Sequence, residues 1–235
     1  MTTPDPTGRQ HAGGDAAGPV GDGAGRSGAV RLLVASRNAK KLAELRRVLA
    51  SAGVEGIEPI GLDEVPEFAE EPEDGTTFAE NALIKARTGA RETSLPCVAD
   101  DSGLTVEALN GMPGVLSARW AGLHGDDAAN NELLLAQLSD VPDERRGAAF
   151  VSSCALVVPG AGSRLESEAV GEGRWEGEIL RAPRGEAGFG YDPLFLPAGS
   201  EWSAAELSAE EKDAVSHRGL ALAELVPALR RLATP

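Results

Sequence analysis

The sequence lacks the features that mark membrane and secreted proteins. Its apolar runs stop well short of the ~20 residues that a membrane span requires, and the N-terminus carries no apolar stretch typical of a secretory signal. Cysteine is rare: Cys97 and Cys154 are the two in 235 residues, too few for a disulfide framework and typical of a reducing compartment. We therefore expect a cytoplasmic protein without a membrane partner.

Positive charge is also scarce. The chain carries 22 Lys and Arg against 37 Asp and Glu, which gives a formal net charge of −15 at pH 7. A surface of this charge repels polynucleotides, so we expect no nucleic-acid partner. A small phosphorylated ligand is not excluded, because it requires only a local cluster of Lys and Arg.

Bulky apolar side chains are almost absent from residues 1–28. A segment of this composition cannot offset its ordering entropy by burial, so it predicts a disordered tail. The folded domain is expected over residues 29–235.

Hydrophobic patterning predicts a mixed α/β fold for this domain. Strand and helix patterns alternate in the first half, whereas strands predominate in the second half before a closing helix after Gly219. The predicted strands are 30–35, 57–60, 97–99, 104–109, 148–158, 165–170, 175–180 and 194–196, and the predicted helices follow residue 41 and cover 78–93 and 126–138. Ser203–Glu206 has the form of a capping box. This order predicts a cleft between two lobes.

Two acidic clusters are candidates for a metal site. Asp100-Asp101 follows the predicted strand 97–99, at the position where open α/β sheets place their ligands. Adjacent carboxylates repel each other unless a cation or hydrogen bonds stabilise them, and Mg²⁺ prefers such oxygens. The loop Glu70–Asp74 offers further carboxylates. The alternative for both clusters is a solvated acidic surface.

The turn Ser36–Lys41 joins the first predicted strand to the first predicted helix. Helix N-terminal amides together with lysines suit a phosphate, although the turn is not a P-loop, which requires G-x-x-x-x-G-K-[ST]. The alternative is an ordinary helix cap, formed by Ser36 or Asn38, beside exposed lysines.

A glycine-rich stretch, Gly185–Gly190, provides a second candidate binding segment. Phe189 and Tyr191 beside it are suited to stacking on a base, and Ser216–Gly219 carries donors for a phosphate or a base. A structural role is the alternative for each. The sequence has neither Cys/His zinc spacing nor the G-x-S-x-G elbow of serine hydrolases.

Six ordered motifs together resemble the inosine/xanthosine triphosphate pyrophosphatase family, from about Val30 to the C-terminus. They are Ala35-Ser36-Arg37-Asn38-Ala39-Lys40-Lys41, Gly75-Thr76-Thr77-Phe78-Ala79-Glu80-Asn81-Ala82, Ala99-Asp100-Asp101-Ser102-Gly103-Leu104, Pro113-Gly114-Val115-Leu116-Ser117-Ala118-Arg119, Gly188-Phe189-Gly190-Tyr191-Asp192-Pro193 and Ser216-His217-Arg218-Gly219. One departure is Ser36-Arg37-Asn38, where the family commonly has Thr-Gly-Asn.

The resemblance implies an elongated mixed α/β fold with a central substrate cleft, a homodimer, and Mg²⁺-dependent hydrolysis of ITP, dITP and XTP to monophosphate and pyrophosphate. It implies that Asp101 is the catalytic acceptor and a metal ligand, and that Glu73 is a second metal ligand. The implied substrate-binding residues are Ser36, Arg37, Asn38, Ala39, Lys40, Lys41, Ser102, Phe189, Gly190, Tyr191, Asp192, Lys212, His217 and Arg218.

Base choice follows from the donors that this resemblance places near the purine. Lys212 and Arg218 carry donors only, so aimed at purine C6 they favour the carbonyl of inosine and xanthosine over the amino group of adenine.

Two rival functions stay open from the sequence. One is a related pyrophosphatase of the septum-inhibitor type that acts on modified nucleotides. The other is a nucleotide-binding module without turnover.

Overall fold

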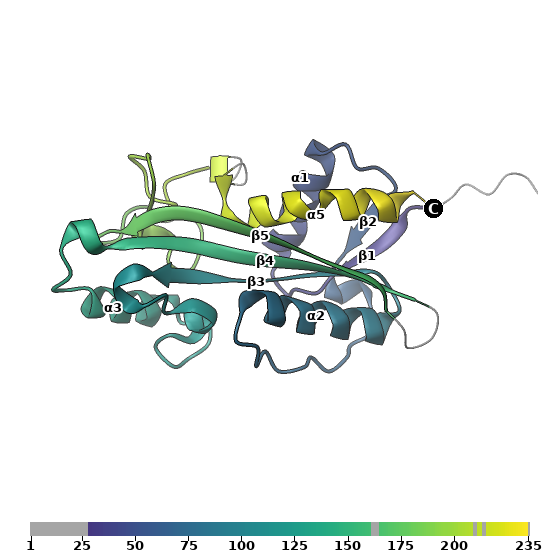
Figure 1. The fold of residues 1–235 in the computed structure, drawn as a ribbon, viewed down its shortest axis with the longest axis horizontal. Helices are drawn as coiled ribbons and strands as arrows, with labels where there is room; N and C mark the ends of the chain where they lie inside the picture. The colour runs from purple at the N-terminus through teal and green to yellow at the C-terminus, as the bar shows by residue number, and fades with distance from the viewer. Residues whose placement is uncertain (1–27, 161–164, 209–210, 213–214, 235) are drawn as a thin grey trace, which may run out of the picture.

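The computed structural model describes residues 28–160, 165–208, 211–212 and 215–234. It is an elongated α/β structure built on one mixed six-stranded sheet of order β2-β1-β3-β4-β5-β6 (Figure 1). The predicted disordered tail lies outside the described residues, apart from Gly28, and stays a prediction. No helix among the described residues is long and apolar enough to cross a membrane.

The first half of the chain builds the parallel part of the sheet. β1 (Val30–Val34) pairs in parallel with β2 (Ile57–Ile60) and with β3 (Cys97–Val106). The helices α1 (Ala39–Ser51) and α2 (Phe78–Thr93) connect these strands. Asn38 caps α1 by accepting from Lys40 N–H at 3.0 Å, and a Thr77–Glu80 capping box begins α2. Both local signals are of the kind that starts helices.

The rest of the sheet is antiparallel and consists of long strands. β3 pairs with β4 (Gly147–Pro159), β4 with β5 (Leu165–Ile179), and β5 with the short β6 (Phe195–Pro197). The helix α3 (Asp127–Gln137) precedes β4, and α5 (His217–Ala233) closes the fold.

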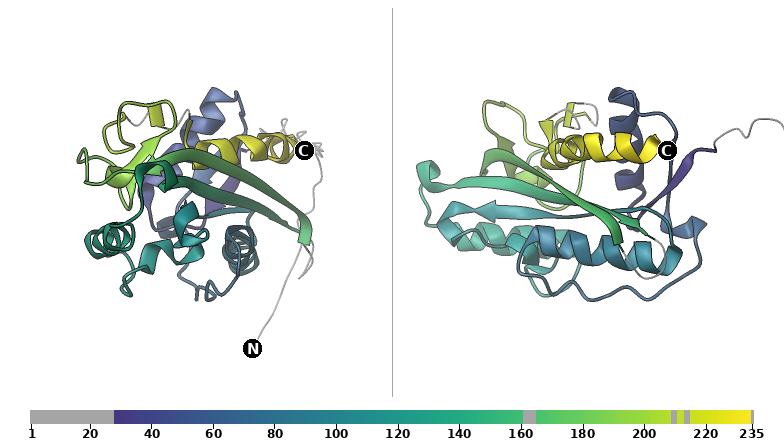
Figure 2. Two further views of the ribbon diagram at one scale, coloured as in Figure 1. Left: turned by 60° about the vertical axis from the view of Figure 1, so that its left-hand side comes forward. Right: turned by 45° about the vertical axis from the view of Figure 1, so that its right-hand side comes forward.

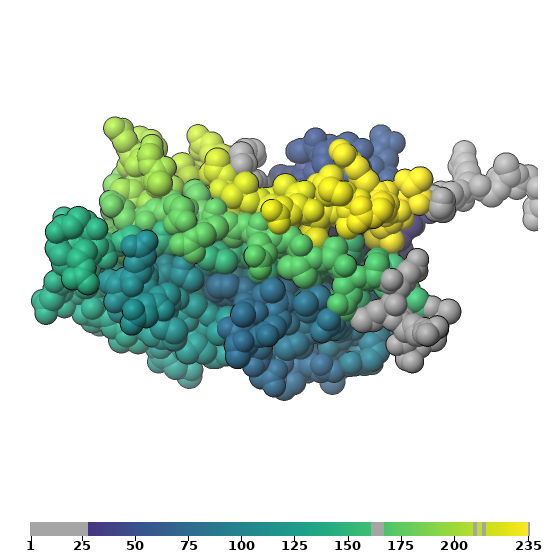
Figure 3. Space-filling model, viewed as in Figure 1, coloured from purple at the N-terminus to yellow at the C-terminus, as the bar shows by residue number. Residues whose placement is uncertain are grey.

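Helices cover both faces of the sheet. Figures 1 and 2 show α1 and α5 on one face and α2 and α3 on the other, and in the space-filling view α5 (yellow) runs along the top of the molecule above β5 (Figure 3). Strand alternation assigns the side chains to these layers. Leu32 and Val98 pack with the α1/α5 layer, whereas Leu33, Cys97 and Ala99 pack with α2.

Two sequence-based predictions of local structure were wrong. The strand predicted to end at residue 99 continues through Asp100–Gly103, because this part of β3 pairs with β4, with Asp100 opposite Cys154 and Asp101 opposite Ser153. The two short strands predicted at 165–170 and 175–180 are one strand, β5. In each case neighbouring strands supply the hydrogen bonds that polar or glycine-rich residues would otherwise seek in turns.

Two further differences concern helix starts. Ser203–Glu206 forms a turn in which the Ser203 hydroxyl donates to the Arg184 carbonyl at 2.7 Å, so its side chain does not cap a helix there. The closing helix begins at His217, earlier than predicted, because Ser216 is its N-cap and accepts from Gly219 N–H.

Candidate active site

A cavity of about 450 Å³ lies where the start of α1, the middle of β3, the 187–192 segment and the start of α5 meet. The fold therefore brings together segments from both halves of the chain. Of the predicted substrate-binding residues, those lining the cavity are Asn38, Lys40, Lys41, Ser102, Phe189, Gly190, Tyr191, Asp192, Lys212, His217 and Arg218. Ser36, Arg37 and Ala39 are not among the lining residues.

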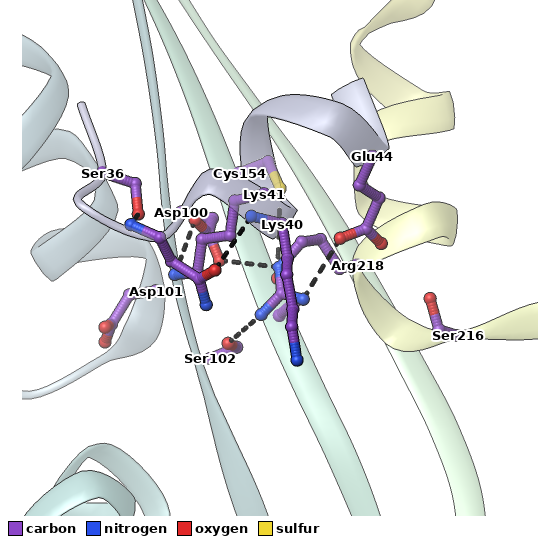
Figure 4. Close-up of polar contacts among 12 residues, drawn as sticks. Ser36, Lys40, Lys41, Glu44, Asp100, Asp101, Ser102, Cys154, Ser216 and Arg218 are labelled. Carbon is purple, nitrogen blue, oxygen red and sulfur yellow. Dashed lines mark hydrogen bonds and ion pairs between the residues drawn. The ribbon is translucent and has the colours of Figure 1, made fainter. Parts of the chain in front are cut away.

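Asp100 is the centre of a buried ionic network on the α1/α5 face of the sheet (Figure 4). Its Oδ1 lies 2.9 Å from Lys41 Nζ, and its Oδ2 accepts from Arg218 Nε at 2.9 Å. Arg218 also donates to Glu44 Oε2 at 3.2 Å and to Ser102 Oγ at 3.0 Å. Each Asp100 oxygen thus has a cationic partner within the protein.

The network sets the charge of its members. Burial alone raises the pKa of Asp100, but Lys41 and Arg218 outweigh burial and hold this pKa well below its ordinary value. Burial lowers the pKa of Arg218, but the negative charges of Asp100 and Glu44 raise it by more, so the net shift is upward. Asp100 is therefore a permanently ionised counterion, which excludes it as a proton acceptor at neutral pH.

Asp101 points to the opposite face of the same strand, as strand alternation requires. In Figure 4 it lies on the left, away from Arg218. Its Oδ1 accepts from Lys85 Nζ at 3.0 Å and its Oδ2 accepts from Asn81 Nδ2 at 3.1 Å. Burial raises the pKa of Asp101, Lys85 and Asn81 lower it, and the negative charge of Glu73 raises it, so the net shift is upward. A carboxylate with a raised pKa is a better proton acceptor than its neighbour Asp100.

Lys85 links Asp101 to the acidic loop. Its Nζ lies 3.2 Å from Glu73 Oε2 and 3.0 Å from Asp101 Oδ1. Burial lowers the pKa of Lys85, but Asp101, Asp100 and Glu73 raise it more, so the ammonium stays charged. One cation position is therefore shared by the two carboxylates that were predicted to bind metal.

The donor set around this position fits Mg²⁺ only in part. No group of three or more His, Cys, Asp and Glu side chains that could hold a metal occurs within the described residues. Asp100 is committed to Lys41 and Arg218. Glu73 and Asp101 supply two carboxylates, which is what Mg²⁺ uses when phosphates and water complete its shell. The residues thus fit a metal ion that is bound together with a phosphorylated ligand.

The turn before α1 divides into an inner and an outer part. Lys40 and Lys41 line the cavity, whereas Arg37 forms a two-pronged ion pair with Glu70 Oε1, at 3.0 and 2.8 Å, and its side chain is 81% exposed. Ser36 Oγ accepts from Asn38 N–H at 3.2 Å and shapes the turn. Arg37 therefore points away from the cavity. It stands where the inosine/xanthosine triphosphate pyrophosphatases commonly have Gly.

Hydrogen bonds from its own residues shape the 187–192 segment, which has no regular secondary structure before Asp192. Asp192 is 2% exposed; it accepts from Phe189 N–H at 2.9 Å and pairs with Lys212. Gly188 has φ +82°, and a Cβ there would lie 2.0 Å from Asp192 Oδ2. A side chain at position 188 would therefore break the loop.

Tyr191 is not placed for stacking on a base. Its hydroxyl donates to the Ser117 carbonyl at 2.9 Å, and burial raises its pKa. Its ring belongs to the core cluster around Leu104 and Phe195. Phe189 is 44% exposed at the cavity, with Lys40, Lys212 and Arg218 within 5.4 to 5.9 Å of its ring centre. Phe189 is thus the aromatic ring available to a ligand.

His217 is buried but not fully hydrogen-bonded. Its ring stacks on Phe150 at 4.9 Å, and its Nδ1 has no hydrogen-bond partner among the described residues. Burial, followed by Arg218 and Lys212, holds its pKa well below 6.5. His217 is therefore neutral at pH 7, and its Nδ1 is buried without a hydrogen-bond partner among the described residues.

Comparisons with known proteins show which family this chain is similar to. The model of the Ham1 family matches residues 32–228. The chain belongs to the Ham1 family. A dITP/XTP pyrophosphatase of Nocardia farcinica is 68% identical over 86% of this chain and 96% of its own length, and one of Mycobacterium tuberculosis is 64% identical over 87% and 97%.

Solved structures of this family have the same fold. The crystal structure of a nucleoside-triphosphatase, a dITP/XTP pyrophosphatase from Mycobacterium abscessus, is 67% identical, covers 86% of this chain and 100% of its own, and has a TM-score of 0.69. A HAM1 protein from Coxiella burnetii is 43% identical, with coverage of 86% and 99% and a TM-score of 0.75.

Sequence reasoning gave no role to several polar residues that this Ham1 site contains. Glu44 faces Arg218 because it lies one helical turn after Lys40 and Lys41; that spacing was a signal available in the sequence. Asp127 accepts from Gly190 N–H at 2.7 Å, and Asn131 donates to the Gly190 carbonyl at 2.9 Å. No local pattern indicated these two contacts, since they join residues about 60 positions apart.

Proposed function

We propose that this Ham1-family chain hydrolyses the non-standard purine nucleoside triphosphates dITP, XTP and ITP to monophosphate and pyrophosphate with Mg²⁺. The observation that carries the proposal is the division of labour on β3. Asp100 neutralises the cations on one face, whereas Asp101 meets Glu73 around one cation position on the other. The names of relatives at 64 to 68% identity support the substrate class.

The first step is binding of the triphosphate at the start of α1. The free N–H groups of a helix N-terminus favour anions, and Lys40 and Lys41 add positive charge at the same edge of the cavity. Lys41 keeps Asp100 as its counterion, so its ammonium is already held in place when a phosphate arrives. Ser102, which accepts from Arg218, places a hydroxyl beside the same phosphates. Ser36, Arg37 and Ala39 contribute the shape of the turn.

Asp101 orients and deprotonates the attacking water. Asp100 is committed to Lys41 and Arg218, whereas Asp101 faces the acidic loop. Glu73 and Asp101 would hold Mg²⁺, which would supply neutralisation of phosphate charge in phosphoryl transfer. Lys85 balances the carboxylates and the departing pyrophosphate from the side of α2.

The base occupies the end of the cavity formed by Phe189–Asp192 and the start of α5. Phe189 stacks on the purine, and such stacking is indifferent to base identity. The neutral His217 is part of the cavity wall at this end. Lys212 and Arg218 are already bonded to Asp192 and Asp100. They therefore act mainly by fixing these neighbours, with any remaining donors available to a C6 carbonyl. The cavity between the α1 and α5 ends is the substrate cleft of a two-lobed molecule.

The cellular setting follows from the same function. Removing non-standard triphosphates from the nucleotide pool places the protein in the cytoplasm, where its two free, buried cysteines persist as thiols. It acts as a homodimer and binds neither nucleic acid nor membrane. Sedimentation at micromolar concentration tests the dimer, since a monomer there contradicts it.

Product identity tests the function. The protein is incubated with Mg²⁺ and a panel of dITP, XTP, ITP, ATP and modified pyrimidine triphosphates, and pyrophosphate and orthophosphate are measured separately. We expect IMP and pyrophosphate from ITP in one step. Stepwise orthophosphate release with IDP, a preference for modified pyrimidines, or binding without turnover would each reject the proposal.

A further inference from the structure

Asn81 is a buried residue of α2 whose amide bonds in two directions. Its side chain is 1% exposed. Nδ2 donates to Asp101 Oδ2 at 3.1 Å, and Oδ1 accepts from the backbone N–H of Gly75 at 2.9 Å. Gly75 lies two residues after Glu73. One amide therefore joins the strand that carries Asp101 to the loop that carries Glu73.

We propose that Asn81 is a positioning residue that holds the Glu73 loop at the separation from Asp101 at which both carboxylates bind one metal ion. This inference rests on the function proposed above, which assigns those carboxylates to Mg²⁺. It adds a residue that hydrogen-bonds the carboxylate of Asp101 directly and holds the loop of Glu73 through the main-chain N–H of Gly75.

The two partners of the amide fix its orientation. Asp101 offers only acceptor oxygens when ionised, and the Gly75 N–H offers only a donor. A flipped amide would place an oxygen against a carboxylate and an NH₂ group against an N–H. Asparagine satisfies both partners from one side chain, whereas aspartate would place a second negative charge beside Asp101 and leucine would leave the Gly75 N–H and Asp101 Oδ2 without this partner.

The loop is built for close approach at this point. A Cβ on Gly75 would lie 2.7 Å from Asn81 Oδ1 and 2.7 Å from Glu80 Cβ, closer than real contacts allow. Glu80 secures the adjoining residues: its Oε2 accepts from Thr76 N–H at 2.7 Å and from Thr77 N–H at 3.1 Å. The N-terminal turn of α2 thus holds the end of the acidic loop through two side chains.

Asn81 and Lys85 both link the loop to the strand, but only Asn81 leaves the Glu73 carboxylate free to bind a metal ion. Lys85 bridges the same loop and strand through the carboxylates of Glu73 and Asp101, which are the groups a metal ion would take. Asn81 bonds the main chain of the loop instead, so the carboxylate of Glu73 stays available. The Asn81 link therefore persists when a metal ion lies between the two carboxylates.

Metal affinity in the presence of nucleotide tests the inference. Mn²⁺ binding to the full chain with a non-hydrolysable ITP analogue is measured by electron paramagnetic resonance, for the wild type and Asn81→Leu. Loss of a residue that orients metal ligands typically costs ~10- to 100-fold in metal affinity. We expect weakening of this size in Asn81→Leu, with a lower kcat and a KM for ITP at saturating Mg²⁺ within about twofold of wild type, since Asn81 is not among the residues that line the cavity.

A matched control is available on the same helix. Thr88 is 2% exposed, and its Oγ1 has no hydrogen-bond partner among the described residues. Thr88→Val changes a buried polar side chain of α2 without touching the loop, so we expect unchanged Mn²⁺ affinity. Equal weakening in Thr88→Val would show a general loosening of α2 and overturn the inference.

Two further outcomes are decisive. A folded Asn81→Leu protein with Mn²⁺ affinity and kcat within about twofold of wild type overturns the positioning role. If Asn81→Leu does not fold, Gly75→Ala decides in its place, because its Cβ disrupts the same bond from the loop side; wild-type metal affinity there rejects the inference. A wild type that binds Mn²⁺ but does not release pyrophosphate from ITP rejects the proposed function instead.

Discussion

Asp100 and Asp101 are adjacent and chemically identical, yet the two faces of β3 give them opposite properties. On the α1/α5 face, two cations bond Asp100 and depress its pKa. On the α2 face, burial raises the pKa of Asp101 above its ordinary value although Lys85 and Asn81 oppose the shift. One face therefore holds a fixed counterion, and the other holds the carboxylate that we propose as the proton acceptor. Strand alternation is the whole physical cause, since one residue of register separates them.

Removing the counterion should give the largest effect, and it should fall on stability. Asp100→Ala leaves Arg218 and Lys41 without their shared partner in a buried site, which typically costs about 3–5 kcal/mol of unfolding free energy. Urea unfolding at pH 7 measures it. Asp143→Ala is the matched control: this carboxylate pairs with Arg181 at the surface and is 76% exposed, so its loss should cost under about 1 kcal/mol. Similar losses of unfolding free energy in the two variants would show that the buried Asp100 network stabilises the fold no more than a surface ion pair does.

Removing the proton acceptor should leave the fold intact and stop turnover. Asp101→Asn is nearly isosteric and keeps an oxygen for Asn81 or Lys85, but it loses charge and basicity. Loss of a general base typically costs ~10² or more in rate, so kcat for ITP should fall at least that far. Because the ionised form of Asp101 is disfavoured by burial, the melting temperature should equal or exceed that of the wild type. Near wild-type kcat would remove Asp101 from the mechanism.

The effect of acid on the free energy of unfolding should have opposite signs for Asp100 and Asp101. The pKa of Asp100 is lower in the folded state than in the unfolded state, so its contribution to stability is complete above about pH 4 and is lost as the pH falls further. The pKa of Asp101 is raised, so its ionised form costs stability at neutral pH and protonation relieves that cost as the pH falls. Relative to wild type, Asp100→Asn should show a shallower loss of stability below pH 4, and Asp101→Asn should not. Unfolding free energies from pH 2.5 to 7 test this, and equal slopes in both variants would contradict it.

The smallest effect is expected outside both faces. Arg37 lies in the turn predicted to bind phosphate, but its exposed side chain pairs with Glu70 away from the cavity. Surface ion pairs of this kind contribute about 0–1 kcal/mol, so Arg37→Ala should keep kcat/KM for ITP within about twofold. Lys41→Ala is the comparison variant, since Lys41 lines the cavity. A loss in Arg37→Ala as large as in Lys41→Ala would show that Arg37 turns inward to the substrate.

The fold was predictable where local patterns decide it. The apolar run at Val30 became β1, and the helix predicted at 78–93 has those bounds because a capping box at Thr77 begins it. The family was also predictable from motif order. The error at Asp100–Gly103 has a clear cause: acidic and small residues are typical of turns, and only the partner strand β4 makes this segment a strand.

The composition and motif order alone determined that the chain would fold as a mixed α/β protein carrying carboxylates, lysines and a glycine-rich segment. Tertiary structure alone decided what each charged group faces: Asp100 meets Lys41 and Arg218, while Asp101 meets Lys85 and Asn81. Arg218 lies 118 positions from Asp100 and 174 from Glu44. Side-chain ionisation depends on distances and burial within a few ångströms, and contacts across such sequence separations exist only once the sheet and its helices have assembled.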